Sequence, residues 1–282
     1  MRTDGETIAE GLAFPEAPRW HADALWFSDM HGHEVLRLDG DGAIASVAEV
    51  PECPSGLGFL PDGRLLVVSM HDRRVLRLDE DGLHQHADLS SLAAWHCNDM
   101  CVDALGRAYV GNFGDGSAPP APPAPTVLIL VEPDGSTRVA AKDLLFPNGA
   151  AITPDGGTLI VAETRAAPGR LTAFSIEPDG TLSERRTLVS FAGGELPDGI
   201  ALDAELGIWV ALPFSDEVVR VDAQGSIDRR LAFANPYAVA VGGPHGNDLF
   251  VCSAPSWLPE EAARLRGGAI HRLSLEGTGG GA

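Results

Sequence analysis

The chain is poor in basic residues, and this shortage limits the partners that it can bind. It carries 20 lysine and arginine residues against 40 aspartate and glutamate residues, a formal net charge of −20 at pH 7. Lys142 is the only lysine. A surface of this kind repels the phosphates of nucleic acids and the headgroups of anionic membranes, so we expect neither as a partner.

Cysteines and long apolar runs are scarce as well. The four cysteines form no CxxC pair and no recognisable disulfide framework, so we interpret them as buried or partly buried thiols in a reducing cytoplasm; they are Cys53, Cys97, Cys101 and Cys252. The N-terminal stretch MRTDGETIAE lacks the apolar run of a signal peptide or anchor. No segment approaches the length of a membrane helix, and we expect a cytoplasmic protein.

The sequence does contain one motif that is repeated six times. Residues 145–163, LFPNGAAITPDGGTLIVAE, show it clearly: two apolar segments, the second rich in β-branched residues, flank the turn PDGG. The copies align on the position of Asn148 and read FPEAPRW, CPSGLGF, HCNDMCV, FPNGAAI, LPDGIAL and NPYAVAV. The period of roughly 40 to 50 residues is typical of a propeller or a solenoid.

Four short strands per repeat, with a glycine-containing turn at each corner, predict an all-β fold: a six-bladed β-propeller with four antiparallel strands per blade. We predict one domain over residues 1–282, because the repeats account for nearly the whole chain. An N-terminal strand at about residues 6–11 should close the ring in the last blade and hide a sheet edge. The tail 277–282 is expected to be disordered. A β-sandwich with chance similarity is the alternative, and six in-register copies argue against it.

Strand direction places the residues aligned with Asn148 around the channel mouth at one face. The six are Glu16, Ser55, Asn98, Asn148, Asp198 and Tyr237. Two carboxylates held so close together repel each other, and each loses part of its solvation. A divalent cation bound between them compensates for the repulsion and for the lost solvation. Oxygen ligands suit Ca²⁺ or Mg²⁺, while Mn²⁺ and Zn²⁺ are also compatible. The alternative is a set of polar groups that only hydrogen-bond water in a wet channel.

Three long connections should lie on the same face as this ring. Residues 114–125, GDGSAPPAPPAP, are either a stiff polyproline-like spacer or a lid or pocket wall. Residues 164–169, TRAAPG, form the second connection. Residues 254–268 form the third, which we expect to hold a short helical turn at residues 259–265 and to bring Trp257 to the rim.

Several of these motifs resemble the SMP-30/gluconolactonase/luciferin-regenerating-enzyme (LRE) family over almost the whole chain: PEAPRW, CNDMCVDALGRAYVGN, PNGAAITPDGGTLIVAET and PDGIALDAELGIWVA. The resemblance implies one divalent metal at the channel mouth of a six-bladed propeller. By resemblance Glu16, Asn148 and Asp198 are its ligands, and Asn98 is a further ligand or a substrate contact. Asp198 would also act as the general base. Asp99, next to Asn98, would support the site from behind.

The chain departs from the family pattern where a substrate would bind. His96 stands where sugar-lactone members often have arginine, and Asn112 lies in Gly-Asn-Phe where Gly-Thr-Met is frequent. Glu163 replaces a common aspartate. We predict substrate contacts at His96, Asn98, Asn112 and Tyr237. His96 either hydrogen-bonds a substrate or is only a hydrogen-bonded rim histidine.

The leading interpretation is therefore a metal-dependent hydrolase, a gluconolactonase-like lactonase that acts on small-molecule lactones and is a monomer. Polarisation of the lactone carbonyl and attack by water assisted by Asp198 would open the ring. One alternative is a phosphotriesterase or arylesterase of the diisopropylfluorophosphatase type, favoured by a hydrophobic rim at Phe113, Phe214, Tyr237 and Trp257. The other is a non-enzymatic ligand-binding propeller. No GxSxG motif or phosphate-binding loop competes with the metal site.

Overall fold

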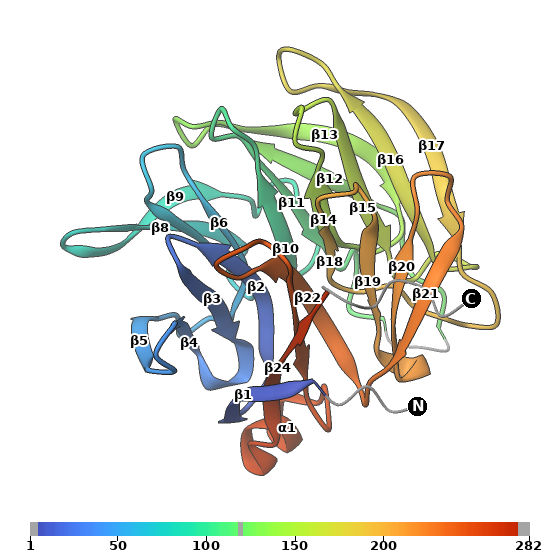
Figure 1. Cartoon of the computed structure of the whole chain (residues 1–282). Helices are drawn as coiled ribbons and strands as arrows, with labels where there is room; N and C mark the ends of the chain where they lie inside the picture. The colour runs from blue at the N-terminus through green and yellow to red at the C-terminus, as the bar shows by residue number, and fades with distance from the viewer. Residues whose placement is uncertain (1–4, 118–120, 276–282) are drawn as a thin grey trace.

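The computed structural model describes residues 5–117 and 121–275 as six four-stranded antiparallel sheets around a common axis (Figure 1). The innermost strands of the sheets gather at the centre of this view. The predicted six-bladed propeller is therefore confirmed, with four strands in each blade. Pairing within each blade is antiparallel throughout, as expected for strands joined by tight turns.

The strands of the six blades follow from inside to outside. Blade 1 holds β2 (Pro15–His21), β3 (Ala24–Asp29), β4 (Glu34–Asp39) and β5 (Ile44–Glu49). Blade 2 holds β6 (Pro54–Phe59), β7 (Leu65–Ser69), β8 (Arg74–Asp79) and β9 (Gly82–Asp88). Blade 3 holds β10 (Cys97–Val102), β11 (Ala108–Asn112), β12 (Thr126–Val131) and β13 (Thr137–Leu144).

The second half of the ring repeats this order. Blade 4 holds β14 (Pro147–Ile152), β15 (Thr158–Glu163), β16 (Arg170–Ile176) and β17 (Leu182–Ser190). Blade 5 holds β18 (Ile200–Leu202), β19 (Ile208–Leu212), β20 (Glu217–Val221) and β21 (Ile227–Ala232). Blade 6 holds β22 (Pro236–Gly242), β23 (Asp248–Ser253), β24 (Gly268–Ser274) and the N-terminal strand β1 (Glu6–Leu12).

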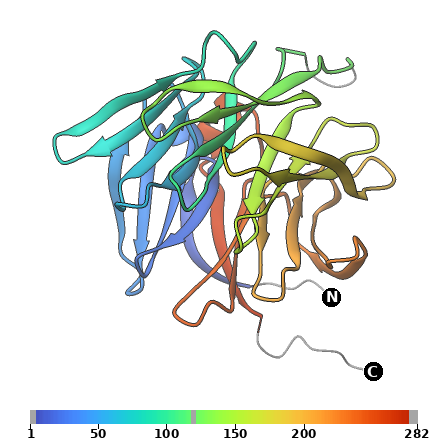
Figure 2. The same cartoon turned by 90° about the horizontal axis from the view of Figure 1, so that it is seen from above.

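The N-terminal strand closes the ring as predicted, because β1 pairs antiparallel with β24 from Glu6–Arg272 to Leu12–Gly268. The observed strand extends one residue past the expected boundary. Ala9 and Leu12 are buried against blade 6, so the strand is held by packing as well as by pairing. Figure 2 shows the first blade in blue beside the last blade in red. The predicted disordered tail, 277–282, lies outside the described residues.

The hydrophobic core lies between neighbouring blades. One cluster joins Ala17 and Val35 of blade 1 to Leu57 and Val67 of blade 2, and comparable clusters fill the spaces between the other blades. Each sheet is apolar on both faces because a neighbouring sheet covers each face. This arrangement leaves the polar side chains at the two ends of the channel and on the outer strands.

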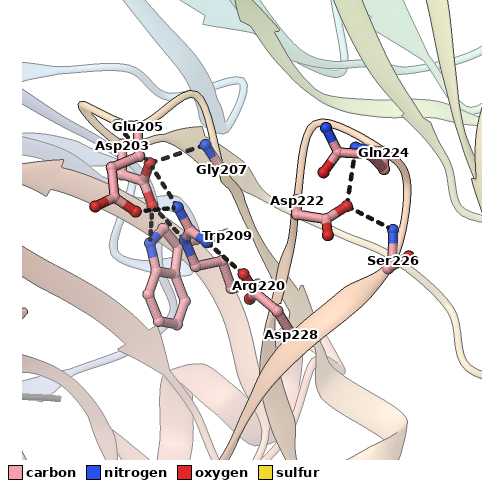
Figure 3. A network of polar contacts seen from close by, with 9 residues as sticks. All are labelled: Asp203, Glu205, Gly207, Trp209, Arg220, Asp222, Gln224, Ser226 and Asp228. Atoms are coloured by element: carbon pink, nitrogen blue, oxygen red, sulfur yellow. Dashed lines mark hydrogen bonds and ion pairs between the residues drawn. The ribbon is translucent and has the colours of Figure 1, made fainter. Parts of the chain in front are cut away.

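The acidic residues of the turns have a repeated structural role. In most blades a turn aspartate accepts a hydrogen bond from the backbone N–H two residues later, as Asp62, Asp134, Asp155, Asp203 and Asp222 do. In blade 5, Asp203 also accepts from Trp209 Nε1 at 3.1 Å and from Arg220 Nε at 2.6 Å (Figure 3). Much of the negative charge therefore stabilises turns.

The predicted helical turn is present as helix α1 (Pro259–Leu265), and Trp257 before it is exposed. Two 3-10 turns, η1 (Met30–Gly32) and η2 (Pro213–Ser215), join second to third strands on the same face. All four cysteines are free and buried. Within the described residues, no helix has the length and apolar character needed to cross a membrane.

Candidate active site at the channel mouth

A β-bulge in the innermost strands turns the predicted site residues toward the axis. Pairing with the second strand shifts register between Glu16 and Arg19 in β2 and between Pro147 and Ala150 in β14, and β6, β10 and β22 shift at the equivalent place. A bulge of this kind re-aims a side chain without ending the strand. The site residue of each of these five blades is thus the second residue of its innermost strand.

Asp198 differs because β18 begins only at Ile200. The Asp198 N–H donates to the carbonyl of Ala211 at 3.0 Å, and the Gly199 N–H donates to the carbonyl of Tyr237 at 2.9 Å. These bonds hold the aspartate at the mouth even though the strand has not started.

Glycines beside the site residues allow the innermost strands to approach each other. A Cβ on Gly149 would lie 2.4 Å from the Asp198 carbonyl oxygen, and one on Gly56 would lie 2.4 Å from the Met100 nitrogen. Real Cβ atoms do not tolerate such distances, so glycine is required for this close backbone approach. The Asn-Gly and Ser-Gly pairs of the repeat thus bring side chains of adjacent blades within hydrogen-bonding reach.

The site residues of four successive blades form a chain of polar contacts. Ser55 Oγ donates to Asn98 Oδ1 at 3.3 Å, and Asn98 Nδ2 donates to Asn148 Oδ1 at 2.6 Å. Asn148 in turn lies close enough to Asp198 to favour its ionised form. The structure therefore brings together the polar residues that the sequence aligned across blades 2 to 5.

The two carboxyl groups of the ring, the buried Glu16 and the half-buried Asp198, are close enough to interact. Glu16 is 9% exposed and accepts a hydrogen bond from the Ala17 N–H at 2.8 Å. Burial, then the negative charges of Asp198 and Asp99, raises the pKa of Glu16 well above its usual value. Burial and the charge of Asp99 raise the pKa of Asp198 to about 8, against the opposing effect of the Asn148 amide. Neither carboxylate has an ion-pair partner among the described residues.

The nearest arginine is already paired. Arg19 of β2 donates through Nη2 to Asp99 Oδ1 at 2.8 Å and to the Met100 carbonyl at 2.7 Å across the channel. Asp99, which is 6% exposed, also accepts from the Met100 N–H at 2.8 Å. The guanidinium is therefore committed to Asp99, so Glu16 and Asp198 have no cationic partner. Their raised pKa values favour protonation in the metal-free protein, whereas a divalent cation would favour the ionised pair.

Aromatic rings and two imidazoles, those of His71 and His96, line the rim above blades 2 to 4. The ring of His96 stacks on Trp95 at 4.9 Å and lies 4.5 Å from His71. Phe113 stacks on Phe146 at 4.3 Å. Burial lowers the pKa of His96, and His71 adds to this effect, so the imidazole is neutral at pH 7. His96 therefore supplies no positive charge in place of the family arginine.

A second aromatic group stands on the opposite side of the mouth. Tyr237 packs on Phe14 at 4.5 Å, and Phe14 lies 5.2 Å from His31. Burial and the charges of Asp198 and Glu16 raise the pKa of Tyr237, which keeps its phenol neutral. The His31 ring contacts the Trp257 carbonyl at 3.3 Å, which ties the loop before α1 to η1.

Asn112 does not lie where a substrate contact was predicted. It is fully buried, its Nδ2 donates to the Val127 carbonyl at 2.8 Å, and its Oδ1 accepts from Thr126 Oγ1 at 2.6 Å and the Gly114 N–H at 3.0 Å. The amide shapes the start of the loop 114–125. Phe214, by contrast, is 60% exposed on η2, and it lies on the channel-mouth face as expected.

The proline-rich connection is fastened to blade 4. Arg165 donates to Ser117 Oγ at 2.9 Å and to the Ala121 carbonyl. Asp115 accepts from the Ala124 N–H at 2.9 Å. These contacts favour the wall interpretation over the spacer interpretation for the described part of the loop.

Some residues beside the site carried little signal in the sequence. Arg19 stands inside the PEAPRW motif, yet nothing there indicated its partner 80 residues away. Phe14 and Phe146 each precede a motif proline and could have been noticed as a repeated aromatic. Thr164 hydrogen-bonds Asn148 but has no local signature.

One further carboxylate–histidine group lies on the opposite face of blade 2. Asp79, Asp81 and His84 are close enough to hold a cation, and they stand beside a cavity of about 650 Å³ that Trp26 and Phe59 help to line. Asp79 already accepts from Arg77 and Arg64. The charge of this group is thus compensated, unlike that of the channel-mouth carboxylates.

Fold and site together define a six-bladed propeller with an oxygen-rich cluster at the channel mouth. Residues 14–255 match the family described as SMP-30/Gluconolactonase/LRE-like region, and the chain belongs to that family. It is 26% identical over 274 residues to pentonolactonase XacC of Haloferax volcanii, which covers 94% of this chain and 91% of the relative.

Two solved structures are similar over the whole ring. The gluconolactonase XC5397 of Xanthomonas campestris superimposes with a TM-score of 0.75 at 26% identity, over 95% of this chain and 88% of that one. Regucalcin of Agrobacterium tumefaciens, described as a calcium-binding protein, superimposes with a TM-score of 0.79 at 22% identity, over 95% and 92% of the two chains. At that identity, the second likeness supports the fold alone.

Proposed function

We propose that the protein is a metal-dependent lactonase that opens the ring of a small lactone at the channel mouth. The observation that carries the proposal is a pair of neighbouring carboxyl groups, Glu16 and Asp198, that have raised pKa values, no ion-pair partner among the described residues, and the amide of Asn148 beside them. The predicted enzyme class, a hydrolase of ester bonds related to gluconolactonases, agrees with the named relatives, which include a pentonolactonase and a gluconolactonase.

The donor set fits a hard divalent cation. Glu16, Asn148 and Asp198 would supply three oxygens from blades 1, 4 and 5, and Asn98 would supply a further one or contact the substrate. Calcium is our first choice, since all donors are oxygens. Magnesium, manganese and zinc remain alternatives that the experiment below separates.

A cation held there would polarise a lactone carbonyl and lower the pKa of nearby water. Asp198 would take the proton from the attacking water as general base, which requires its ionised form. The neighbouring Asn148 amide favours that form. Tyr237 and Phe14 would cover one side of the mouth and limit access of bulk water. The product is a ring-opened hydroxy acid.

The aromatic rim favours a second candidate substrate class. His96 is neutral and flanked by Trp95, while Phe113 and Phe146 stack beside it. Such a wall suits an apolar aryl ester or phosphotriester at the same site, because it offers area to bury and few donors for sugar hydroxyls. We rank this activity second, since the named relatives are lactonases.

Proton release from a panel of lactones, beginning with glucono-1,5-lactone, tests the proposal. Protein stripped of metal should be inactive, and Ca²⁺, Mg²⁺, Mn²⁺ or Zn²⁺ added singly should restore turnover and identify the useful ion. Full activity in the stripped protein would refute metal dependence. If no lactone were hydrolysed but aryl esters or phosphotriesters were, the second candidate function would replace the lactonase.

A further inference from the structure

We propose that Thr164 is a positioning residue that turns the carbonyl oxygen of the Asn148 amide toward the channel and so makes Asn148 a cation ligand. The inference rests on the proposed metal site. It concerns a residue that directly follows β15. Thr164 is 6% exposed, so water does not compete for its hydroxyl.

The Thr164 hydroxyl has a single proton, and its hydrogen-bond acceptor can be identified. Its Oγ1 lies 2.7 Å from the carbonyl oxygen of Pro197, and a carbonyl can only accept. The hydroxyl must therefore donate to Pro197. Toward Asn148, at 3.1 Å, it can then offer only a lone pair, which fixes Nδ2 of Asn148 as the donor in that contact.

This assignment determines the other end of the amide. With Nδ2 facing Thr164, Oδ1 points to the opposite side, where it accepts from Asn98 Nδ2 at 2.6 Å. A reversed amide would place its oxygen against the lone pair of Thr164 and its NH₂ against the NH₂ of Asn98. It would also present an NH₂ group, which cannot bind a cation, where the oxygen is needed.

Thr164 also links the two blades that supply neighbouring ligands. Its backbone N–H donates to the Phe146 carbonyl at 3.2 Å, just before Asn148 in blade 4. Its hydroxyl holds Pro197, which directly precedes Asp198 in blade 5. One residue thus sets both the orientation of one ligand and the position of the next, as residues behind metal ligands commonly do.

The test compares the cation affinity of three variants with that of the wild type by competition with a chelator, for Ca²⁺ and Mn²⁺ separately. Thr164→Val replaces the hydroxyl by a methyl group of similar size, and we expect about 10–100-fold weaker binding. Thr164→Ser keeps the hydroxyl and should bind within about threefold of the wild type. Thr172→Val is the matched control, because it removes another buried hydroxyl of blade 4, one that donates to Glu163.

The control should lower the melting temperature of the metal-free protein but leave both cation affinities unchanged, which separates a structural loss from a loss of ligand orientation. Thr164→Ala removes the same hydroxyl and serves if the valine variant does not fold. Wild-type affinity in a folded Thr164→Val or Thr164→Ala variant would overturn the role of Thr164 alone. If the wild type itself bound neither ion, both the proposed metal site and the proposed positioning role of Thr164 would be refuted.

Discussion

Asp198 is a half-buried carboxyl group with no ion-pair partner among the described residues. Its pKa is raised to about 8 by burial and by the charge of Asp99, and the one nearby guanidinium, that of Arg19, is bound to Asp99. A carboxyl group with so strongly raised a pKa is typical of a functional site. Its neighbours explain why it can still act: Asn148 stabilises the charged form, and a cation would do so more strongly.

At this scale we predict that Asp198→Asn folds but loses nearly all lactone turnover. The amide keeps the size and one oxygen of the side chain, yet it cannot take a proton from water, and loss of a general base costs about 10²–10⁴-fold in rate. Steady-state kinetics on metal-loaded protein, with circular dichroism to verify folding, measure the effect. Activity within about threefold of wild type would remove Asp198 from the mechanism.

Among the elements, blade 4 carries the clearest structural ion network. Glu163 at the end of β15 is fully buried and accepts from Arg170 Nε at 2.9 Å, Arg185 Nη2 at 3.0 Å and the Leu145 N–H at 3.0 Å. Burial by itself raises the pKa of Glu163, but the bonds from Arg170, Thr172 and Leu145 outweigh it and lower the pKa. The Glu163 side chain, which is longer than that of the aspartate common in the family, therefore stabilises the end of β15 just before Thr164.

The lowered pKa of Glu163 sets the sign of a pH dependence. Its stabilising contribution is present above the unfolded-state pKa of about 4.3 and is lost as the pH falls through the lower folded-state value. Glu163→Gln should thus be about 1–3 kcal/mol less stable at pH 7, because charged hydrogen bonds to a buried acceptor are lost. Urea unfolding at pH 7 and pH 3 measures it, and an equal deficit at both values would contradict this account.

The loop 114–125 belongs to the same scale. Arg165 fastens the loop to blade 4, and Gly116 lies against the ring of Trp95 at the aromatic rim. We therefore predict that deleting residues 118–124 leaves the propeller folded and changes the ratio of kcat/KM between sugar lactones and apolar esters. Arg165→Gln, which removes the fastening without shortening the chain, is the companion variant. Unaltered kinetics across the panel in both variants would reduce the loop to a spacer.

For the molecule as a whole, the proposed ligands come from three blades that are far apart along the chain. A cation bound by Glu16, Asn148 and Asp198 would join blades 1, 4 and 5 across the axis. Because it binds only the folded ring, it should stabilise by about 2.7 kcal/mol at a hundredfold excess over its Kd, and chelation should lower the melting temperature by roughly 5 °C. Melting curves with EDTA and with added ion measure this; identical curves, with metal analysis proving removal, would argue against the site.

The sequence by itself determined the number of blades, the closing strand, the helical turn at Pro259–Leu265 and the ring of Glu16, Asn148 and their equivalents. These features are written locally, in strand periodicity, turn residues and the repeat of a proline-linked motif, so each copy can be recognised without the others. The glycine that follows Asn148 and the glycine that follows Ser55 are also part of the local motif.

Only the tertiary structure decided which of these groups meet. The pairing of Arg19 with Asp99, the burial of Asn112, the stacking of Phe113 on Phe146 and the orientation of the Asn148 amide by Thr164 all depend on contacts outside the local motif. Several of them join different blades. Such contacts form when the ring closes and the inner strands pack closely at their glycine positions. No short-range sequence pattern predicts them.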